Sequence, residues 1–464
     1  MMIDRHFMKQ KMETKEEGCC CCCFFTLLRL HNHRISSLLL ILFVVVVVSP
    51  EFITCAAPIA INYGQIANNL PSPEYVVPLV KSIGATRLKL YDADPTVLKA
   101  FANTGVEFIV SLGNQYLSKT RDPKQALAWV KANVQPFLPA TRITCIAVGN
   151  EVLTFNDTSL SSNLLPAMQS VYSALCSLNL QDKVSVTTAH SLAVLQTSYP
   201  PSAGRFRPDL APCLTAILNF HLKTGSPFLI NAYPYFAYKA NPKQVPLEFV
   251  LFQPNPGILD PATNLHYDNM LFAQIDAVHS AVESLGFKDD AVCVQISETG
   301  WPSKGDADEA GATPENAKKY NGNLINKLVC GKKGTPMRPN ADLNIYVFAL
   351  FNENMKSGPT SERNYGLFKP DGSPAYYIGF NGTGLLSTSS NTSTTPSSTG
   401  SSSTSTSSVP PGSSSSSGGP TSSTGYLSIT SDAGLHALPS AVPHLLLMIC
   451  WLVLLLAFQL PREH

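Results

Sequence analysis

Two glutamates in this sequence each come directly after a hydrophobic, strand-like run. Glu151 follows the run 146–150, and Glu298 follows the run 292–297, in which apolar and polar residues alternate. The second run must end by Pro302, because proline cannot donate to a strand ladder. A glutamate at the end of a buried strand is costly without a partner. Two carboxyl groups, one to protonate a departing oxygen and one to attack or to activate water, are what cleavage of a glycosidic bond requires.

Further groups with suitable chemistry stand close to these glutamates in the sequence. Trp301 comes three residues after Glu298. An exposed indole there would be a platform for the apolar face of a sugar ring, although the residue could also belong to the core of a barrel rim. Glu353 ends another hydrophobic run and is a third candidate, because Lys356 could keep its carboxylate ionised.

Glu151 and Glu298 are 298 − 151 = 147 residues apart, so only a closed fold can bring them face to face. Apolar strand-like runs alternate with amphipathic helical stretches from residue 59 to about 380, which indicates a parallel sheet covered on both faces. Eight repeats favour a closed (β/α)8 TIM barrel over an open sheet. The predicted strands are 59–63, 86–91, 106–112, 143–148, 184–188, 228–233, 292–297 and 345–351. The predicted helices are 75–83, 96–103, 123–134, 160–178, 210–222, 267–285 and 314–328.

In a barrel of this type the chemistry gathers at the carboxyl ends of the strands. The predicted strand ends are polar or aromatic in nearly every case: Tyr63, Tyr91, Asp92, Asn114, Asn150, Glu151, His190, Tyr233, Glu298, Asn352 and Glu353. Contact with water explains a polar strand end such as Asp92 or His190. It explains Asn150, Glu151 and Glu298 poorly, because each arrives directly from a hydrophobic strand. No glycine-rich dinucleotide fingerprint follows the first strand.

Composition divides the 464 residues into four parts. Residues 1–57 are predicted to be a leader with a secretory signal peptide, because basic residues precede the short apolar run 37–48 and small residues follow it. A membrane-spanning helix is the alternative, but it needs about 20 apolar residues. The barrel is assigned to residues 58–386. Residues 387–431 are rich in Ser, Thr and Pro and are predicted to be a disordered, solvated stalk.

Residues 432–464 are predicted to be a propeptide that is removed. Small residues, a spacer and the apolar run 445–460 form the pattern of a glycosylphosphatidylinositol attachment signal, with Ser431 as the attachment site. A single transmembrane helix is the alternative, although the apolar run is short for a membrane core of about 30 Å. We therefore expect a secreted monomer anchored to the outer leaflet of the plasma membrane, on the side of the cell wall.

The remaining composition restricts partners and cofactors. The formal charge of +1 argues against nucleic acid as a partner. No cluster has metal-ligand spacing, and the expected chemistry needs no cofactor. Five widely spread cysteines, of which two are predicted in buried strands, allow at most one or two bridges: Cys145, Cys176, Cys213, Cys293 and Cys330. The glycosylation sequons begin at Asn156, Asn381 and Asn391.

Several motifs resemble glycoside hydrolase family 17, the plant endo-1,3-β-glucosidases, over residues 59–380. They are INYG (61–64), KLYD (89–92), VGNEV (148–152), NAYPY (231–235), SETGWPS (297–303) and FNEN (351–354). The resemblance implies a (β/α)8 barrel that hydrolyses internal 1,3-β-glucosidic bonds of callose or wall glucan with retention. It implies that Glu151 is the proton donor and Glu298 the nucleophile. The implied substrate-binding residues are Tyr63, Tyr91, Asn114, Asn150, Tyr233, Trp301, Glu353, Lys356 and Glu362.

The sequence departs from the family pattern in three places. Residues 111–115 read SLGNQ where many members have Gly-Ile/Val-Pro-Asn, and Tyr365 stands where many have Trp, which could alter one sugar subsite. The cysteine-rich glucan-binding domain of many anchored relatives is not found between the barrel and the anchor signal. Two other functions stay open at this point: a β-glucan transglycosylase with the same covalent intermediate, and a catalytically weak glucan-binding protein that organises the wall.

Overall fold

The computed structural model describes residues 59–155, 158–288, 291–330 and 334–378. Eight strands in this part of the chain pair in parallel and close into a barrel in the order β1-β12-β11-β8-β5-β4-β3-β2. The strands are β1 (Ile59–Asn62), β2 (Ala85–Lys89), β3 (Glu107–Leu112), β4 (Arg142–Asn150), β5 (Ser185–Ser191), β8 (Phe228–Asn231), β11 (Val294–Thr299) and β12 (Ile345–Val347). The predicted (β/α)8 barrel is confirmed.

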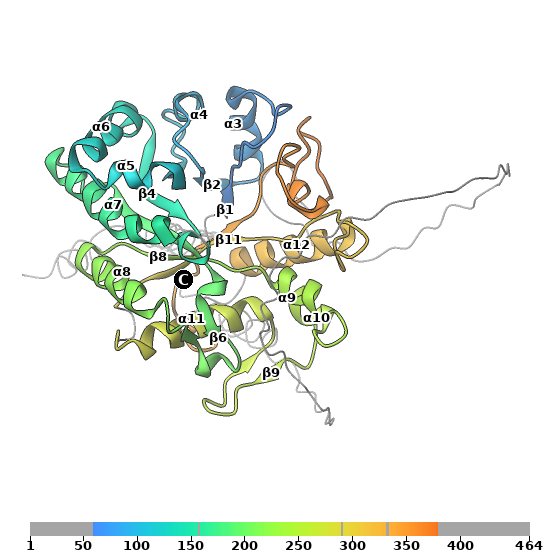
Figure 1. Ribbon diagram of the computed structural model, residues 1–464. Helices are drawn as coiled ribbons and strands as arrows, with labels where there is room; N and C mark the ends of the chain where they lie inside the picture. The colour runs from blue at the N-terminus through green and yellow to red at the C-terminus, as the bar shows by residue number, and fades with distance from the viewer. Residues whose placement is uncertain (1–58, 156–157, 289–290, 331–333, 379–464) are drawn as a thin grey trace, which may run out of the picture. The chain divides into compact units, whose positions relative to one another are not determined.

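Helices surround the strands on the outside (Figure 1). Those that cross from one barrel strand to the next are α3 (Pro73–Ser82), α4 (Pro95–Ala100), α6 (Pro123–Asn133), α7 (Thr158–Ser177), α8 (Ala211–Thr224), α11 (Met270–Ser284) and α12 (Pro314–Cys330). Shorter helices are α5 (Leu117–Thr120), α9 (Pro234–Ala240) and α10 (Leu247–Val250). Single 3-10 turns are η2 (Asn114–Tyr116), η3 (Gln135–Phe137), η4 (Val152–Thr154), η5 (Leu192–Val194), η6 (Pro201–Ala203) and η7 (Thr360–Arg363). Two small antiparallel pairs complete the fold: β6 (Leu195–Thr197) with β7 (Arg205–Phe206), and β9 (Ile258–Leu259) with β10 (His266–Tyr267).

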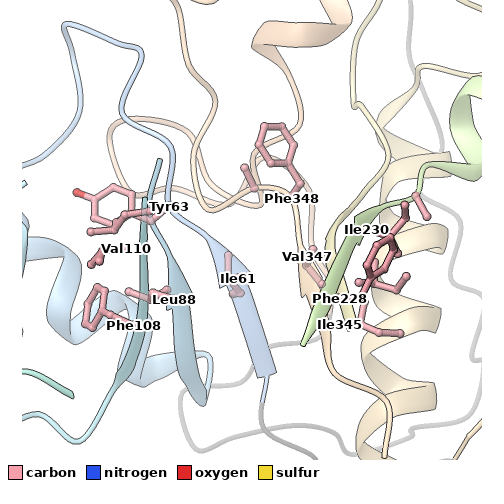
Figure 2. Packing of buried hydrophobic residues seen from close by; sticks show 14 of the residues in the cluster. Ile61, Tyr63, Leu88, Phe108, Val110, Phe228, Ile230, Ile345, Val347 and Phe348 are labelled. Carbon is pink, nitrogen blue, oxygen red and sulfur yellow. The ribbon is translucent and has the colours of Figure 1, made fainter. Parts of the chain in front are cut away.

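Alternate strand residues build two hydrophobic clusters, because successive side chains of a strand point to opposite faces. The larger cluster includes strand residues such as Leu88, Phe108 and Val110, together with the apolar faces of the helices (Figure 2). The smaller cluster contains residues from six strands that alternate with these: Ala60, Ile109, Cys145, Ala147, Ala189, Leu229 and Tyr346. A barrel filled by packed side chains is a rigid scaffold for the strand ends.

The strand bounds differ most from prediction at β12, with smaller differences at β5 and β11. The strand predicted over 345–351 ends at Val347; beyond it, Leu350 N still donates to Asn62 O of β1, but Ala349 N donates to Tyr365 O, outside the barrel strands. Cys293 was predicted in a buried strand and is instead exposed, because β11 begins only at Val294. Cys145 is buried in β4, as predicted.

The predicted leader, stalk, propeptide and anchor site Ser431 lie outside the described residues, as do the sequons at Asn156, Asn381 and Asn391. Within the described ranges, no helix has the length and apolar character needed to cross a membrane. The four barrel cysteines whose side chains the structure describes are free thiols: Cys145, Cys176, Cys213 and Cys293.

Candidate active site

A cleft of about 520 Å³ opens at the carboxyl ends of the barrel strands. It is lined by residues at the ends of seven strands or in the segments that follow them; these strands are β1, β2, β3, β4, β8, β11 and β12. Nine of the predicted site residues line it: Tyr63, Tyr91, Asn150, Glu151, Tyr233, Glu298, Glu353, Lys356 and Glu362. The closure of the barrel thus brings together residues that are spread over 300 positions of the chain.

Glu298 is placed by the end of β11 and held by two donors. Lys89 Nζ lies 2.8 Å from Oε1, and the hydroxyl of Tyr233 donates to Oε2 over 3.0 Å. Lys89 comes from β2 and is buried, so its ammonium group is a fixed positive charge inside the barrel mouth. A cation and a hydroxyl donor both stabilise a carboxylate in its ionised form. Glu298 is therefore arranged to carry negative charge toward the cleft.

Glu151 comes directly after β4, in a backbone turn that aims its side chain into the cleft. Gly149 (φ 72°) and Glu151 (φ 56°) both have left-handed backbone conformations, and a glutamate adopts this region rarely. The amide of Asn231 donates to Glu151 Oε1 over 3.0 Å. Burial raises the pKa of Glu151, and the negative charge of Glu298 raises it further, against the opposing effect of the Asn231 hydrogen bond. Glu151 therefore favours the protonated form more than an exposed glutamate does.

Asn114 supports the turn at Asn150 and does not line the cleft. Its side-chain oxygen accepts from Asn150 N over 2.8 Å, and its amide donates to Asn150 O over 3.0 Å. The sequence predicted Asn114 as a substrate-binding residue. In the structure both of its polar groups bond the backbone next to Glu151, so Asn114 positions the turn that carries Glu151.

Glu353 lies against the end of β1, where its carboxylate faces Gly64. A Cβ atom at Gly64 would come within 2.5 Å of the Glu353 carboxylate oxygens, so a larger residue there would displace that carboxylate. Glu353 Oε1 accepts from the backbone N–H of Ile66 over 2.8 Å. Burial raises the pKa of Glu353, and the neighbouring Lys356 lowers it. Lys356 in turn pairs with Glu362 over 3.4 Å.

Trp301 is not a sugar platform, which corrects the prediction made from its position beside Glu298. Its side chain is 0% exposed and lies behind the cleft. The ring packs edge-on against Tyr235 at 5.2 Å and near Tyr320 at 5.6 Å, and its Nε1 donates to Gly311 O over 2.8 Å. The indole thus anchors the loop between β11 and α12, because the loop 302–313 folds back over it.

The aromatic lining of the cleft comes from other residues. Phe348 and Tyr365 line it, with ring centroids 5.4 Å apart, and Tyr233 packs against both at 6.2 and 5.8 Å. Phe236 lines the cleft from α9 and is 45% exposed. Apolar rings with a few polar groups are the usual lining of a site that binds a small molecule or a sugar chain.

Sequence reasoning missed three residues that position the two glutamates: Lys89, Asn231 and Ser297. Lys89 had only a weak local signal: it is the last residue of β2 and stands between Leu88 and Leu90. Asn231 and Ser297 had none beyond their places in the family motifs, since Asn231 acts by bonding Glu151 and Ser297 by bonding Asn231 Oδ1 over 2.6 Å. These contacts join residues 66 and 80 positions apart.

The sequence profile of the glycosyl hydrolases family 17 matches residues 59–380, which include every barrel strand and the whole cleft. The chain belongs to this family. The family 17 domain therefore covers the strand ends that carry Glu151 and Glu298. Within the described ranges, no three His, Cys, Asp or Glu side chains group so that they could hold a metal ion.

Relatives of the family 17 domain have similar sequences and folds. It is 69% identical over 328 residues to glucan endo-1,3-beta-glucosidase 11 of Arabidopsis thaliana, which covers 70% of this chain and 76% of the relative. It is 60% identical over 334 residues to glucan endo-1,3-beta-glucosidase 10 of the same plant, covering 72% and 79%. Among solved structures, it superposes on CJP38, a beta-1,3-glucanase and pollen allergen of Cryptomeria japonica, with a TM-score of 0.66 at 42% identity. That superposition covers 70% of this chain and 99% of CJP38.

Proposed function

We propose that this protein hydrolyses internal 1,3-β-glucosidic bonds of a β-1,3-glucan, with retention of the anomeric configuration. The observation that carries the proposal is the unequal surroundings of two carboxyl groups on one cleft: Glu298 faces a lysine, and Glu151 faces a neutral amide. Two carboxyl groups held in different protonation states are the acid and nucleophile of glycoside hydrolysis. The relatives named as glucan endo-1,3-beta-glucosidases support β-1,3-glucan as the substrate.

In the first step Glu298 attacks the anomeric carbon, and an ester bond forms between the sugar and the enzyme. The bond from that carbon to the glycosidic oxygen breaks, and Glu151 gives its proton to the departing oxygen. Lys89 and Tyr233 hold the nucleophile in place, because each bonds one oxygen of Glu298. The aromatic rings of Phe348 and Tyr365 line the same cleft and offer apolar surface to the sugar rings.

The second step uses the electrostatic link between the two glutamates. The charge of Glu298 raises the pKa of Glu151, so esterification of Glu298 removes that charge and lowers the pKa. Glu151 is then ionised and can accept a proton from water, which attacks the anomeric carbon and breaks the ester. Two displacements at the same carbon give net retention.

The test is product analysis on a linear β-1,3-glucan, with the wild type and Glu298→Gln side by side and early products followed by proton NMR. We expect short β-anomeric oligosaccharides from the wild type. We expect turnover by Glu298→Gln to fall by roughly four orders of magnitude, as when one member of an interdependent catalytic set is lost. Glucan binding should persist in the variant.

Other outcomes of this test lead to other functions. Intact polymer bound to folded wild-type protein would identify a glucan-binding protein. Products longer than the substrate would identify a transglycosylase, and equal cleavage by both proteins would show that Glu298 is not the nucleophile. Early α-anomers would contradict retention.

We also propose that the enzyme is anchored by lipid to the outer face of the plasma membrane. The support is in the sequence: the apolar run 37–48, the stalk 387–431 and the apolar run 445–460. Treatment of plasma membranes with phosphatidylinositol-specific phospholipase C should release the protein. Release by detergent alone would instead indicate a transmembrane helix.

A further inference from the structure

Glu151 has two carboxyl oxygens with different surroundings. Oε1 accepts the hydrogen bond from Asn231 Nδ2 over 3.0 Å. No donor among the described residues bonds Oε2. The side chain lines the cleft, so Oε2 is the oxygen open to a substrate.

The orientation of the Asn231 amide follows from its neighbours. Asn231 is buried at the end of β8, next to Glu298 in the register of β8 and β11. The hydroxyl of Ser297 donates to Asn231 Oδ1 over 2.6 Å. The opposite side of the amide, Nδ2, faces Glu151 Oε1 and, at 3.5 Å, the side-chain oxygen of Asn150.

Rotation of this amide by 180° would be costly because of Ser297. The Ser297 side chain is 0% exposed, and Asn231 Oδ1 is the acceptor of its hydroxyl proton. After rotation Ser297 would face an NH2 group, and its own proton would be buried without an acceptor. Asn231 Oδ1 would then also face two oxygens, those of Glu151 and Asn150.

We propose that Ser297 and Asn231 are positioning residues that select Oε2 as the oxygen of Glu151 that carries the proton. A carbonyl oxygen accepts an N–H bond better than a hydroxyl oxygen does, so the acid places its O–H on the side away from Asn231. That side is the cleft, where the departing glycosidic oxygen must receive the proton. With a rotated amide, the proton would instead sit on Oε1 in a hydrogen bond to Asn231 Oδ1, pointing away from the substrate.

The proton balance of the step is simple. The O–H bond of Oε2 breaks as the bond from the proton to the departing oxygen forms, and Glu151 is left as a carboxylate with Oε1 still bonded to Asn231. This inference rests on the proposed role of Glu151 as proton donor, but it concerns different residues and can fail separately.

The test compares two substrates that differ in their need for an acid. One is a linear β-1,3-glucan oligosaccharide, whose sugar leaving group requires protonation. The other is the 2,4-dinitrophenyl β-glycoside of a β-1,3-linked glucose disaccharide, whose leaving group departs without a proton. We expect kcat/KM on the oligosaccharide to fall about 10-fold in Ser297→Ala and about 100-fold in Asn231→Ala, within the range that general acid catalysis contributes. On the dinitrophenyl glycoside both variants should stay within about 3-fold of the wild type, since the acid is not needed there.

The pH profile supplies a second readout that a purely structural defect would not move. The Asn231 hydrogen bond lowers the pKa of Glu151, so its loss should shift the basic limb of kcat/KM to higher pH. The matched control is Thr299→Val, which removes a buried hydroxyl from the same strand, bonded to Tyr320 and away from the cleft. It should leave both activities and the pH limb unchanged.

Two outcomes separate the inference from the function on which it rests. Glu151→Gln should lose kcat/KM on the oligosaccharide alone, because kcat/KM reports the first step; an equal loss of kcat/KM on both substrates would overturn Glu151 as the acid. If Glu151→Gln behaves as expected, equal losses on both substrates in Ser297→Ala, with an unmoved pH limb, would overturn the selection of Oε2. Ser297→Ala keeps the inference testable if Asn231→Ala does not fold.

Discussion

Two lysine–glutamate pairs stand at the carboxyl end of the barrel, and they are built differently: both glutamates are buried, but only Lys89 is a buried lysine, whereas Lys239 is partly exposed. Lys89 and Glu298 are 2.8 Å apart, and Lys239 and Glu309 are 2.7 Å apart. Glu298 receives one further donor, the hydroxyl of Tyr233, so each of its oxygens accepts one bond. Glu309 receives four donors, two on each oxygen, including the backbone and hydroxyl of Ser361.

The number of donors separates a reactive carboxylate from a structural one. All four lone pairs of Glu309 are used, and its side chain is 0% exposed. Although burial raises its pKa, the bonds from Lys239 and Ser361 hold the pKa of Glu309 at about 2. Glu298 keeps lone pairs free and lines the cleft. One pair pins the loop after β11 to η7, and the other presents a nucleophile.

The Lys239–Glu309 pair also affects the cleft indirectly, through the loop after β11. Glu309 bonds Ser361 N over 2.8 Å, and Asp306 in the same loop accepts from Thr360 N over the same distance. Both contacts hold the start of η7, the turn that carries Glu362 to the cleft. Trp301 fixes the other end of the loop through Gly311. The loop 302–313 therefore helps to position Glu362 at the cleft, although the loop itself does not line the cleft.

The largest difference between the pairs should appear when each lysine is removed. Lys89→Met leaves Glu298 buried without its cation, so we expect kcat/KM on a linear β-1,3-glucan to fall about 1,000-fold. Lys239→Met should lower kcat by less than about 3-fold, because Glu309 does not face the substrate. Steady-state kinetics on the folded variants measures both. Similar losses in the two variants would contradict the assignment of different roles.

Glu309→Gln should show the opposite pattern, a loss of stability with kcat retained. A buried carboxylate with four donors becomes an amide whose NH2 group faces donors, which we expect to cost about 3 kcal/mol of unfolding free energy. Urea denaturation followed by tryptophan fluorescence measures this change, since Trp301 packs beside the loop.

The pH dependence of stability sharpens the same comparison. The pKa of Glu309 is about 2 in the folded protein, below the value of about 4.3 for an unfolded glutamate. Its contribution of about 3 kcal/mol is thus fully present above pH 4.3 and is lost as the pH falls toward 2. The difference in unfolding free energy between wild type and Glu309→Gln should shrink over this window. A constant difference from pH 7 to pH 2.5 would show that the charge of Glu309 is not what stabilises the loop.

The smallest effect is expected at Trp301. Trp301→Phe keeps an aromatic ring but loses the hydrogen bond from Nε1 to Gly311 O, which should lower the unfolding free energy by about 1 kcal/mol. KM for β-1,3-glucan should not change, because the indole lies behind the cleft. A rise in KM with unchanged stability would show instead that the indole of Trp301 contacts the sugar.

Much of the fold and the site could be predicted from local pattern. Hydrophobic runs of strand length, each followed by an amphipathic helix, were sufficient to predict the eight-stranded barrel, because burial on both faces leaves a periodic record in the chain. Glu151 and Glu298 were found as carboxylates that interrupt buried runs. Once a barrel was expected, Tyr63 and Tyr233 could be predicted to lie near the two glutamates, because the carboxyl ends of all barrel strands meet at one face.

Side-chain direction and long-range partners could not be predicted in this way. Trp301 lies three residues after Glu298, in the loop that follows β11. Its ring points inward because it contacts Gly311 and Tyr320, and both contacts form only in the folded chain. Lys89 contacts Glu298 across 209 residues of sequence, and no local pattern records that contact.

The sequence by itself determined which chemical groups reach the mouth of the barrel, because the alternation of strand and helix dictates where each strand ends. Only the tertiary structure decided what each group does there. Glu151, Glu298 and Glu309 are the same side chain, and their different roles follow from whether an amide, a lysine and a tyrosine, or four donors surround the carboxyl group. Those neighbours come from distant segments, and electrostatic interactions inside a protein depend on distance and burial, which exist only once the chain has folded.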